Sequence, residues 1–333
     1  MLSQRQASDT LERNKPPVQG VAEQSVLKVL SYIIKYRKII TILLLLLLTV
    51  AGGRSWLSEL RDAGPAFWRE RLSILISVAL LQSCDIFLDG FIWWYLLRAA
   101  GIRVPAGKTV LLFLSGYAGL LAPVQLGRLI RPIELKRLGN VPLGAGVLVE
   151  ILLLGFSAVA GVVVLCGALL WPRLGWGAVA AALLALGCAA WVCRFTVLPD
   201  ILTGLKGVIK WHHPALAAAV FLTPIGWLIN GLSLWLVSGP RGSGVPLWEL
   251  FAVAPSNMIV GALSGMPGGI GAVEAWLGGM LSLLGNNAAT LVNEVLLFRL
   301  MTFWIWILIG WLALFVLWRF PDGSLKVLCD ERT

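Results

Sequence analysis

Residues 246–284 read PLWELFAVAPSNMIVGALSGMPGGIGAVEAWLGGMLSLL, and this stretch decides the fold. A hydrophobic arm ends at Gly265-Met266, the chain turns at Pro267-Gly268-Gly269, and a second arm begins near Gly271. A helix needs about 20 consecutive apolar residues to span a bilayer, and the turn divides this hydrophobic stretch into two arms. Non-helical backbone at membrane depth is tolerated only where it is buried in protein or lines a wet cavity. We therefore predict a re-entrant hairpin with its turn inside the protein.

The same arrangement occurs earlier in the chain. Residues Val104 to Arg137 form a hydrophobic stretch that breaks at Ala122-Pro123, and neither half is long enough to cross comfortably. Both turns carry the pattern Pro-x-x-x-Gly, at Pro123 and at Pro267, but that spacing also recurs elsewhere in the chain. The position of each turn inside an interrupted hydrophobic stretch therefore carries the prediction of two re-entrant hairpins.

The composition around the hairpins is that of a polytopic membrane protein. The chain is 58% hydrophobic and 13% charged, too few charged residues to coat a soluble enzyme. We predict an all-α membrane protein with about six full spans, in a domain over residues 36–320. A polar segment, 1–35, precedes this domain, and a short tail, 321–333, follows it. The predicted spans are Ile39 to Gly53, Leu72 to Leu97, Pro142 to Leu170, Leu174 to Val197, Pro214 to Val237 and Ala288 to Trp318.

The distribution of basic residues predicts an orientation. With both hairpins returning to the side from which they enter, 20 of the 27 Lys and Arg residues fall on the side of the N-terminus. Cytoplasmic loops carry the excess of Lys and Arg, so both termini are expected in the cytoplasm. The first hairpin then enters from the cytoplasm and the second from the opposite side. Opposed similar elements indicate a possible inverted repeat.

The net charge of +10 is explained by the basic cytoplasmic loops that membrane proteins of this class carry. Basic loops meet anionic lipid headgroups, and no aromatic-basic module accompanies the charge, so we expect no nucleic-acid partner. His212 and His213 have no third ligand nearby, and we expect no metal or other cofactor. Trp93 lies near a span end and is expected in the interfacial belt, whereas Trp306 is deeper and is a candidate for lining a lipid groove.

Three arginines are candidates for binding an anionic headgroup. Arg128 and Arg131 follow the first turn. A helix that begins there, inside the membrane, directs backbone N–H groups that attract anions, and the two arginines add positive charge. The alternative is that both side chains snorkel to the membrane interface. Arg299 lies within the last span, where a charge requires a partner. Glu274 is the best-placed partner, because Glu294 lies about 140° away around the same helix. The Glu274–Arg299 pair ties the hairpin to the last helix, binds the ligand, or does both.

Carboxyl groups inside the spans are candidates for coupling. Asp85 and Asp89 are four residues apart on one face of their span, and Glu150 lies within the next full span. Intramembrane carboxylates usually face a cavity, where these would relay protons or bind a cation. The alternatives are that they are neutral and hydrogen-bonded, or that they lie nearer the interface.

The C-terminal block resembles the membrane domain of the lysylphosphatidylglycerol synthase/flippase-like family. The resemblance rests on Met266-Pro-Gly-Gly-Ile-Gly-Ala-Val-Glu274, Gly285, Leu297-Phe-Arg299 and Gly310, and its layout extends over residues 36–320. The sequence departs from the family pattern in two places. It has Gly127-Arg128 where members commonly have Gly-Glu, and Ile151 follows Glu150 where Arg is common. Only fifteen residues follow Trp318, too few for the soluble aminoacyl-transferase domain of the bifunctional relatives.

The resemblance implies a carrier that moves a lipid headgroup across the bacterial inner membrane. The cargo is expected to be an anionic phospholipid or a polyprenyl-linked lipid. The alternatives are an intramembrane lipid-modifying transferase and a non-transporting scaffold for lipid-synthesis enzymes. No catalytic motif is recognised, and we expect no enzymatic activity. The expected headgroup site comprises Arg128, Arg131, Glu150, Pro267, Gly268, Gly269, Gly271, Glu274 and Arg299, with Asp85 and Asp89 as expected coupling residues.

Overall fold

The structure is a computed structural model that describes residues 64–195, 213–238, 245–285, 288–321, 323 and 328–329. The predicted segment 1–35 and the predicted span Ile39 to Gly53 lie outside the described residues. All described residues belong to one compact unit, Gly52–Thr333. The division into residues 36–320 and 321–333 stays a prediction.

Long apolar helices dominate this unit, as predicted. Within the described residues, four helices are long and apolar enough to cross a membrane: 68–99, 143–174, 214–238 and 291–318. Together with the shorter helix at residues 176–195, they correspond to five of the six predicted spans, so the all-α polytopic fold is confirmed. The elements are α3 (Gly64–Ala99), α6 (Leu143–Leu174), α7 (Trp176–Phe195), α9 (Pro214–Ser238), α12 (Ala288–Arg299), the π-helical segment η5 (Leu300–Trp304) and α13 (Ile305–Trp318).

Two broken hairpins lie among the long helices, where the interrupted stretches predict them. In each hairpin the two arms pack side by side, and the two tips, η2 (Pro123–Leu129) and η4 (Pro267–Gly269), contact each other. The first is α4 (Ala106–Ser115), η1 (Gly116–Gly119), η2 (Pro123–Leu129) and α5 (Ile130–Gly139). The second is α10 (Leu247–Leu263), η4 (Pro267–Gly269) and α11 (Ala272–Leu283).

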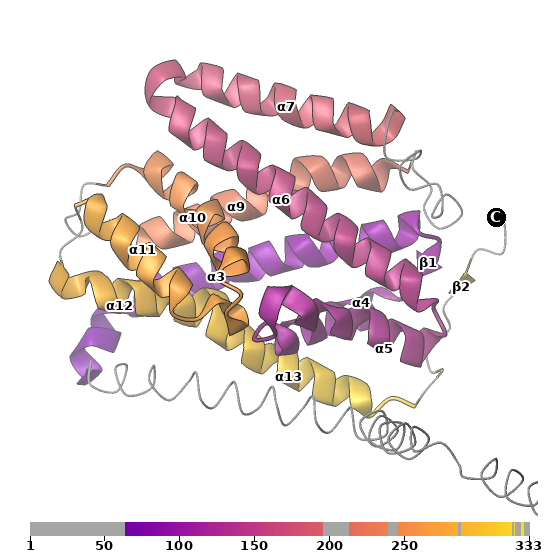
Figure 1. Cartoon of the computed structure of the whole chain (residues 1–333). Coiled ribbons are helices and arrows are strands. Elements are labelled where there is room, and N and C mark those ends of the chain that lie inside the picture. Colours follow the sequence, from indigo (N-terminus) through magenta and orange to yellow (C-terminus); the bar gives the residue numbers. More distant parts are fainter. Residues whose placement is uncertain are drawn as a thin grey trace, which may run out of the picture. The chain divides into compact units, whose positions relative to one another are not determined.

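The two hairpins approach each other from opposite ends of the bundle. Helix α13 packs against α4 and η1, whereas α12, on the other side of η5, packs against α11. The hairpins therefore lie end to end along the last span, and Figure 1 shows their tips meeting near the middle of the long helices. An internal repeat would produce this opposition, and the repeat itself stays a prediction.

Glycines permit the close turns at both tips. Gly119 and Gly127 face each other so closely that a Cβ on either residue would overlap the backbone of the other. In the second hairpin, a Cβ on Gly269 would lie 3.0 Å from the Cα of Gly261. Gly268 and Gly269 have φ of 60° and 68°, the left-handed region that favours glycine. The turn predicted at residues 267–269 is therefore confirmed.

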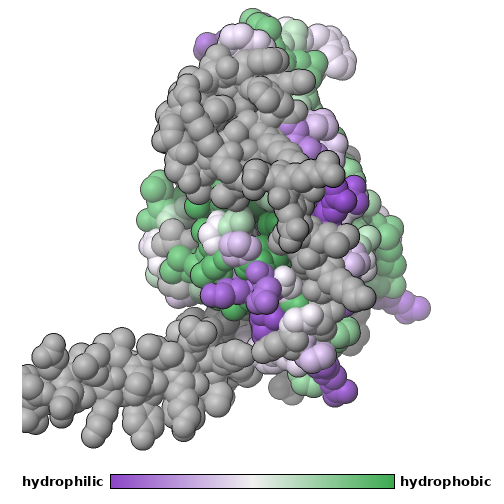
Figure 2. Space-filling model, turned by 90° about the vertical axis from the view of Figure 1, so that its right-hand side faces the viewer, coloured by the Kyte–Doolittle hydropathy of each residue, from purple (hydrophilic) through white to green (hydrophobic). Residues whose placement is uncertain are grey.

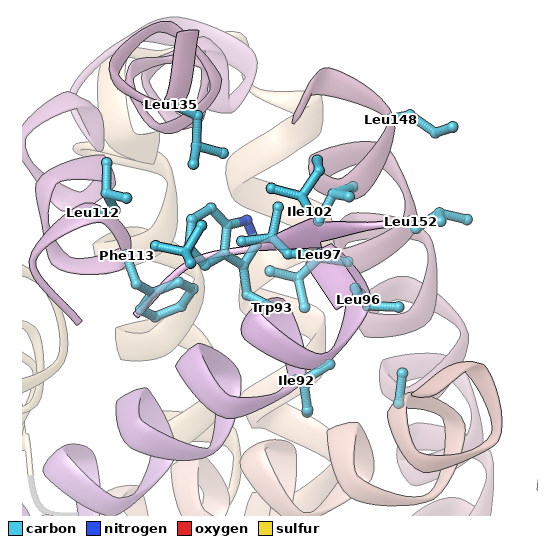
Figure 3. Packing of buried hydrophobic residues seen from close by; sticks show 14 of the residues in the cluster. Ile92, Trp93, Leu96, Leu97, Ile102, Leu112, Phe113, Leu135, Leu148 and Leu152 are labelled. Atoms are coloured by element: carbon cyan, nitrogen blue, oxygen red, sulfur yellow. The ribbon is translucent and has the colours of Figure 1, made fainter. Parts of the chain in front are cut away.

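Each hairpin is fixed by its own apolar cluster. In the first cluster, Trp93 of α3 is fully buried and its ring centroid lies 5.8 Å from that of Phe113 of α4. Figure 3 shows Leu112 and Leu135, from the two arms of the first hairpin, beside this tryptophan. The expectation that Trp93 belongs to an interfacial belt is therefore wrong. The second cluster joins hairpin residues Leu250 and Leu277 to Phe298 of α12.

Basic side chains gather at the end of the bundle where α3, α5 and α13 finish. Strands β1 (Ile102–Arg103) and β2 (Leu328–Cys329) pair there. The Arg137 guanidinium donates to the carbonyls of Leu317 and Phe320 at 2.8 and 2.9 Å. Figure 2 views this end and shows hydrophilic residues on it. The basic residues at this end are Arg98, Arg103, Lys108 at the start of α4, Lys136, Arg137 and Arg319.

Candidate functional site

A polar pocket of about 220 Å³ lies where the two hairpin tips meet. Helix α9, both hairpins and the last span contribute to its wall. Its polar and glycine lining residues are Arg128, Asn230, Asn257, Gly261, Gly268, Gly269, Arg299 and Thr302. Trp306, by contrast, lines a separate apolar pocket of about 390 Å³ between α3, α4 and α13.

The Glu274–Arg299 ion pair expected from the sequence is present. Arg299 Nε donates to Glu274 Oε1 at 2.7 Å, and a terminal guanidinium nitrogen donates to the carbonyl of Gly268 at 3.1 Å. The second carboxylate oxygen, Oε2, accepts from the Gly271 N–H at 2.6 Å. The carboxylate therefore caps the start of α11, where the helix dipole favours negative charge. One pair thus joins the second tip, the start of α11 and the last span.

The last span departs from regular α-helix directly after this arginine. The π-helical segment Leu300–Trp304 begins at the next residue, and such segments are frequent at functional sites. The guanidinium of Arg299 lies over the Phe303 ring at 4.1 Å, and a Cβ on Gly268 would be 2.5 Å from that ring. The irregular turn and the irregular helix thus pack against each other beside the pocket.

Arg131 and Glu150 form a second ion pair, away from the pocket wall. Arg131 donates to Glu150 Oε2 at 3.1 Å, and the two side chains are 2% and 3% exposed. Arg131 also donates from Nε to the Phe113 carbonyl at 2.8 Å and lies over the Phe113 ring at 3.9 Å. A Cβ on Gly116 would overlap this guanidinium. Arg131 therefore joins both arms of the first hairpin to α6.

We expect Glu150→Gln to lower the free energy of unfolding by about 2 kcal/mol. The amide keeps an acceptor for Arg131 but removes the charge, and hydrogen bonds to charged groups contribute about 1.5–3 kcal/mol. Chemical denaturation in detergent measures the change. Glu249→Gln, near the start of α10 and only partly buried, is the matched control and is expected to change stability by less than about 0.5 kcal/mol. Equal losses in the two variants would contradict a structural role for Glu150.

Arg128 is the cation of the site that has no direct partner. Its Nε is buried and has no hydrogen-bond partner, and no ion pair joins the side chain to any described residue. Asp89 of α3 lies close enough to interact electrostatically with Arg128, Arg131 and Glu150. Because Arg131 and Arg299 each pair with a glutamate, Arg128 supplies the positive charge of the pocket that no glutamate pairs with among the described residues.

Asp85 lies in a polar seam between α3 and α9. Its Oδ2 accepts from Asn230 Nδ2 at 2.8 Å, and Asn230 also donates to the Gly226 carbonyl at 2.9 Å. Gln82 donates to Ser233 Oγ at 3.0 Å and to Asn230 Oδ1 at 3.5 Å. Since Asn230 lines the pocket, the seam connects Asp85 to the candidate site.

The structure thus separates the nine predicted headgroup residues into three groups. Arg128, Gly268, Gly269 and Arg299 line the pocket. Pro267, Gly271 and Glu274 form the turn and cap behind it, and Arg131 with Glu150 holds the first hairpin. Sequence reasoning missed Asn230, Asn257 and Phe303. The two asparagines carry a weak signal, since each is a polar residue inside an otherwise apolar helix.

The fold and the pocket define a multi-pass membrane protein with a buried, cationic site between two opposed hairpins. The sequence model of the lysylphosphatidylglycerol synthase TM region matches residues 32–310, and the chain belongs to this family. The family supports a role connected with membrane lipids. A search of curated proteins finds no match to the chain.

Proposed function

We propose that this protein carries an anionic lipid headgroup between the leaflets of the bacterial inner membrane. The observation that carries the proposal is the unpaired Arg128 in a pocket formed where two opposed hairpin tips meet. A buried cation is costly without a partner, and a phosphodiester supplies the missing negative charge. A site accessible from either end through the movement of one hairpin would present the headgroup to each leaflet in turn.

The arginines have different roles in this proposal. Arg128 binds the phosphate directly. Arg299 contributes to the pocket wall, while its ion pair with Glu274 keeps the second tip in place. The acyl or isoprenoid chains stay in the surrounding lipid, so only the polar headgroup enters the pocket. The cargo classes that fit are anionic phospholipids and polyprenyl-linked lipids.

The basic end of the bundle is proposed to face the cytoplasm, as the positive-inside rule requires. Both termini then lie in the cytoplasm, and the first hairpin enters from that side. Asp85 and Asp89 are proposed to couple headgroup movement to a proton or cation. The seam that contains Asp85 reaches the pocket through Asn230, and Asp89 interacts electrostatically with Arg128 of the pocket wall. Lipid-synthesis enzymes are the proposed partners that supply or consume the cargo. The protein itself is proposed to be a carrier rather than an enzyme.

Reconstitution into liposomes tests the proposal. The liposomes contain a fluorescent lipid, either phosphatidylglycerol labelled on its acyl chain or its headgroup, or a labelled polyprenyl phosphate. A membrane-impermeant reagent added outside quenches the label in the outer leaflet. A carrier makes inner-leaflet label accessible faster than in protein-free liposomes. If no anionic or polyprenyl lipid moves faster in either direction, with or without a proton gradient, the proposed function is wrong.

We expect Arg128→Gln to slow lipid movement about 10- to 100-fold while leaving the fold intact. The lost charge-assisted hydrogen bond contributes about 1.5–3 kcal/mol to headgroup binding, and 1.4 kcal/mol corresponds to tenfold. Stability should change little, because Arg128 has no hydrogen-bond partner among the described residues. Arg103→Gln, at an exposed position in β1, is the control and should transport at the wild-type rate. A wild-type rate in the Arg128 variant would remove this residue from the site.

A further inference from the structure

We infer that Asn257 is a specificity-determining residue that reads a hydrogen-bond donor on the headgroup next to the phosphate held by Arg128. The inference rests on the proposed function, since it specifies the chemical class of lipid that the same pocket binds. That class is a phosphodiester whose headgroup carries a hydroxyl or an ammonium group. A phosphodiester capped by a simple alkyl group falls outside it.

Two residues that line the pocket each have a buried polar atom without a hydrogen-bond partner among the described residues. These atoms are Arg128 Nε and Asn257 Oδ1, and neither forms a hydrogen bond within the part of the chain that the structure describes. Arg128 comes from the first hairpin and Asn257 from α10 of the second, and both line the pocket between the tips. One atom is a donor and the other is an acceptor, so the pocket requires two opposite kinds of partner.

Other polar groups of the pocket are already satisfied. Asn230 uses its Nδ2 for Asp85 and Gly226 and its Oδ1 for Gln82. Thr302 donates its hydroxyl to the Phe298 carbonyl at 2.8 Å. Arg299 is bonded to Glu274 and to Gly268. The contrast between the two asparagines matters most, because they line the same pocket and only Asn257 has an unused amide oxygen.

A headgroup with a phosphate and a neighbouring donor satisfies both atoms at once. The phosphate oxygen accepts from Arg128, and a hydroxyl or ammonium group donates to Asn257 Oδ1. A phosphodiester without a donor would leave Oδ1 buried and unpaired. Sites built to hydrogen-bond a ligand hydroxyl or amine reject analogues that lack it, because the buried partner stays unsatisfied. Discrimination by about tenfold is therefore expected.

Competition between phosphatidylglycerol and phosphatidylmethanol tests the inference. Both lipids carry one negative charge on a phosphodiester, and only the first has hydroxyl donors. The two lipids, with identical acyl chains and in equal amounts, are added to the full-length protein in detergent. Native mass spectrometry measures the ratio of the two bound species. We expect the wild type to favour phosphatidylglycerol about tenfold.

Three variants separate the contributions. Asn257→Leu keeps the side-chain volume and should bring the ratio close to one, with Asn257→Ala as a second variant. Arg128→Gln should weaken binding of both lipids to a similar extent. Thr302→Val removes a hydroxyl that is already satisfied and should leave the ratio within about twofold of wild type. The thermal midpoint of Asn257→Leu should be unchanged or higher, since the replaced oxygen has no partner.

Several results would overturn the inference. Equal binding of the two lipids by the wild type, no binding of either, or an unchanged ratio in both Asn257 variants would each do so. Displacement of the bound lipid by equimolar glycerol 3-phosphate would show that the site takes a free phosphate rather than a lipid. The liposome assay is independent of this measurement. Selective binding without lipid movement would therefore reject the carrier while keeping the binding preference of Asn257.

Discussion

The Arg299→Ala protein is expected to lose about 3–5 kcal/mol of unfolding free energy, the range found when one partner of a buried ion pair is removed. The side chain of Arg299 is 9% exposed, and that of Glu274 is 18% exposed. Its removal leaves the Glu274 carboxylate without a cation and frees the Gly268 carbonyl at the second tip. Because Glu274 is less buried than its partner, the loss should lie near the lower end of this range.

Denaturant titration in detergent measures this loss, and a double-mutant cycle with Glu274→Ala isolates the pair. The double variant should be more stable than the sum of the two single losses predicts, since it leaves no uncompensated charge. Arg299→Lys should lose less unfolding free energy than Arg299→Ala, because lysine keeps the positive charge. It should still be less stable than the wild type, because lysine lacks the planar guanidinium that reaches two acceptors. Additive losses in the cycle would show that the two residues act independently.

A charge swap is expected to recover little of this stability. In the Glu274→Arg/Arg299→Glu protein, an arginine stands in the first turn of α11. It cannot accept from the Gly271 N–H, and its charge opposes the helix dipole. The sequence predicts a simple pair at these positions. The structure adds a third participant, the start of the helix, and makes the pair directional.

The hairpins were predictable from the sequence because glycine and proline interrupt stretches that are otherwise uniformly apolar. The partner of Arg299 was also predictable, because an arginine inside a span needs a carboxylate and few are available. Both inferences depend on strong local constraints. In each, the chain itself contains a feature that lipid does not tolerate.

Other features depend on how distant helices pack, and sequence patterns do not encode this. Arg128 and Arg131 are three residues apart. Arg128 lines the pocket, and its Nε has no hydrogen-bond partner among the described residues, whereas Arg131 is bonded to Phe113 and Glu150. Asn230 and Asn257 are both amides inside apolar helices, but only Asn257 has an unused oxygen. Trp93 lies near the end of a span in the sequence, which predicts a position at the membrane interface. It is buried instead, because the re-entrant hairpin packs over it. These distinctions arise only when both tips are in position.

Gly310→Ala is expected to lower the free energy of unfolding by about 3 kcal/mol and to abolish lipid movement. A Cβ at this position would overlap the backbone of Tyr117 and Ala118 in η1, so α13 and the first hairpin would have to separate. Overpacking typically costs about 1–3 kcal/mol, and a clash with backbone belongs at the upper end because no rotamer relieves it.

The displacement should also reach the pocket, since η1 packs against η2, which carries Arg128. Gly155→Ala is the matched control, because this glycine is exposed within α6 and a Cβ there would meet no atom within 4 Å. Alanine favours helix over glycine by about 0.5–1 kcal/mol, so this variant should be unchanged or slightly more stable. Thermal unfolding in detergent and the liposome assay compare the two proteins. If Gly310→Ala transports as fast as Gly155→Ala, close packing of α13 against the first hairpin is not what positions the headgroup site.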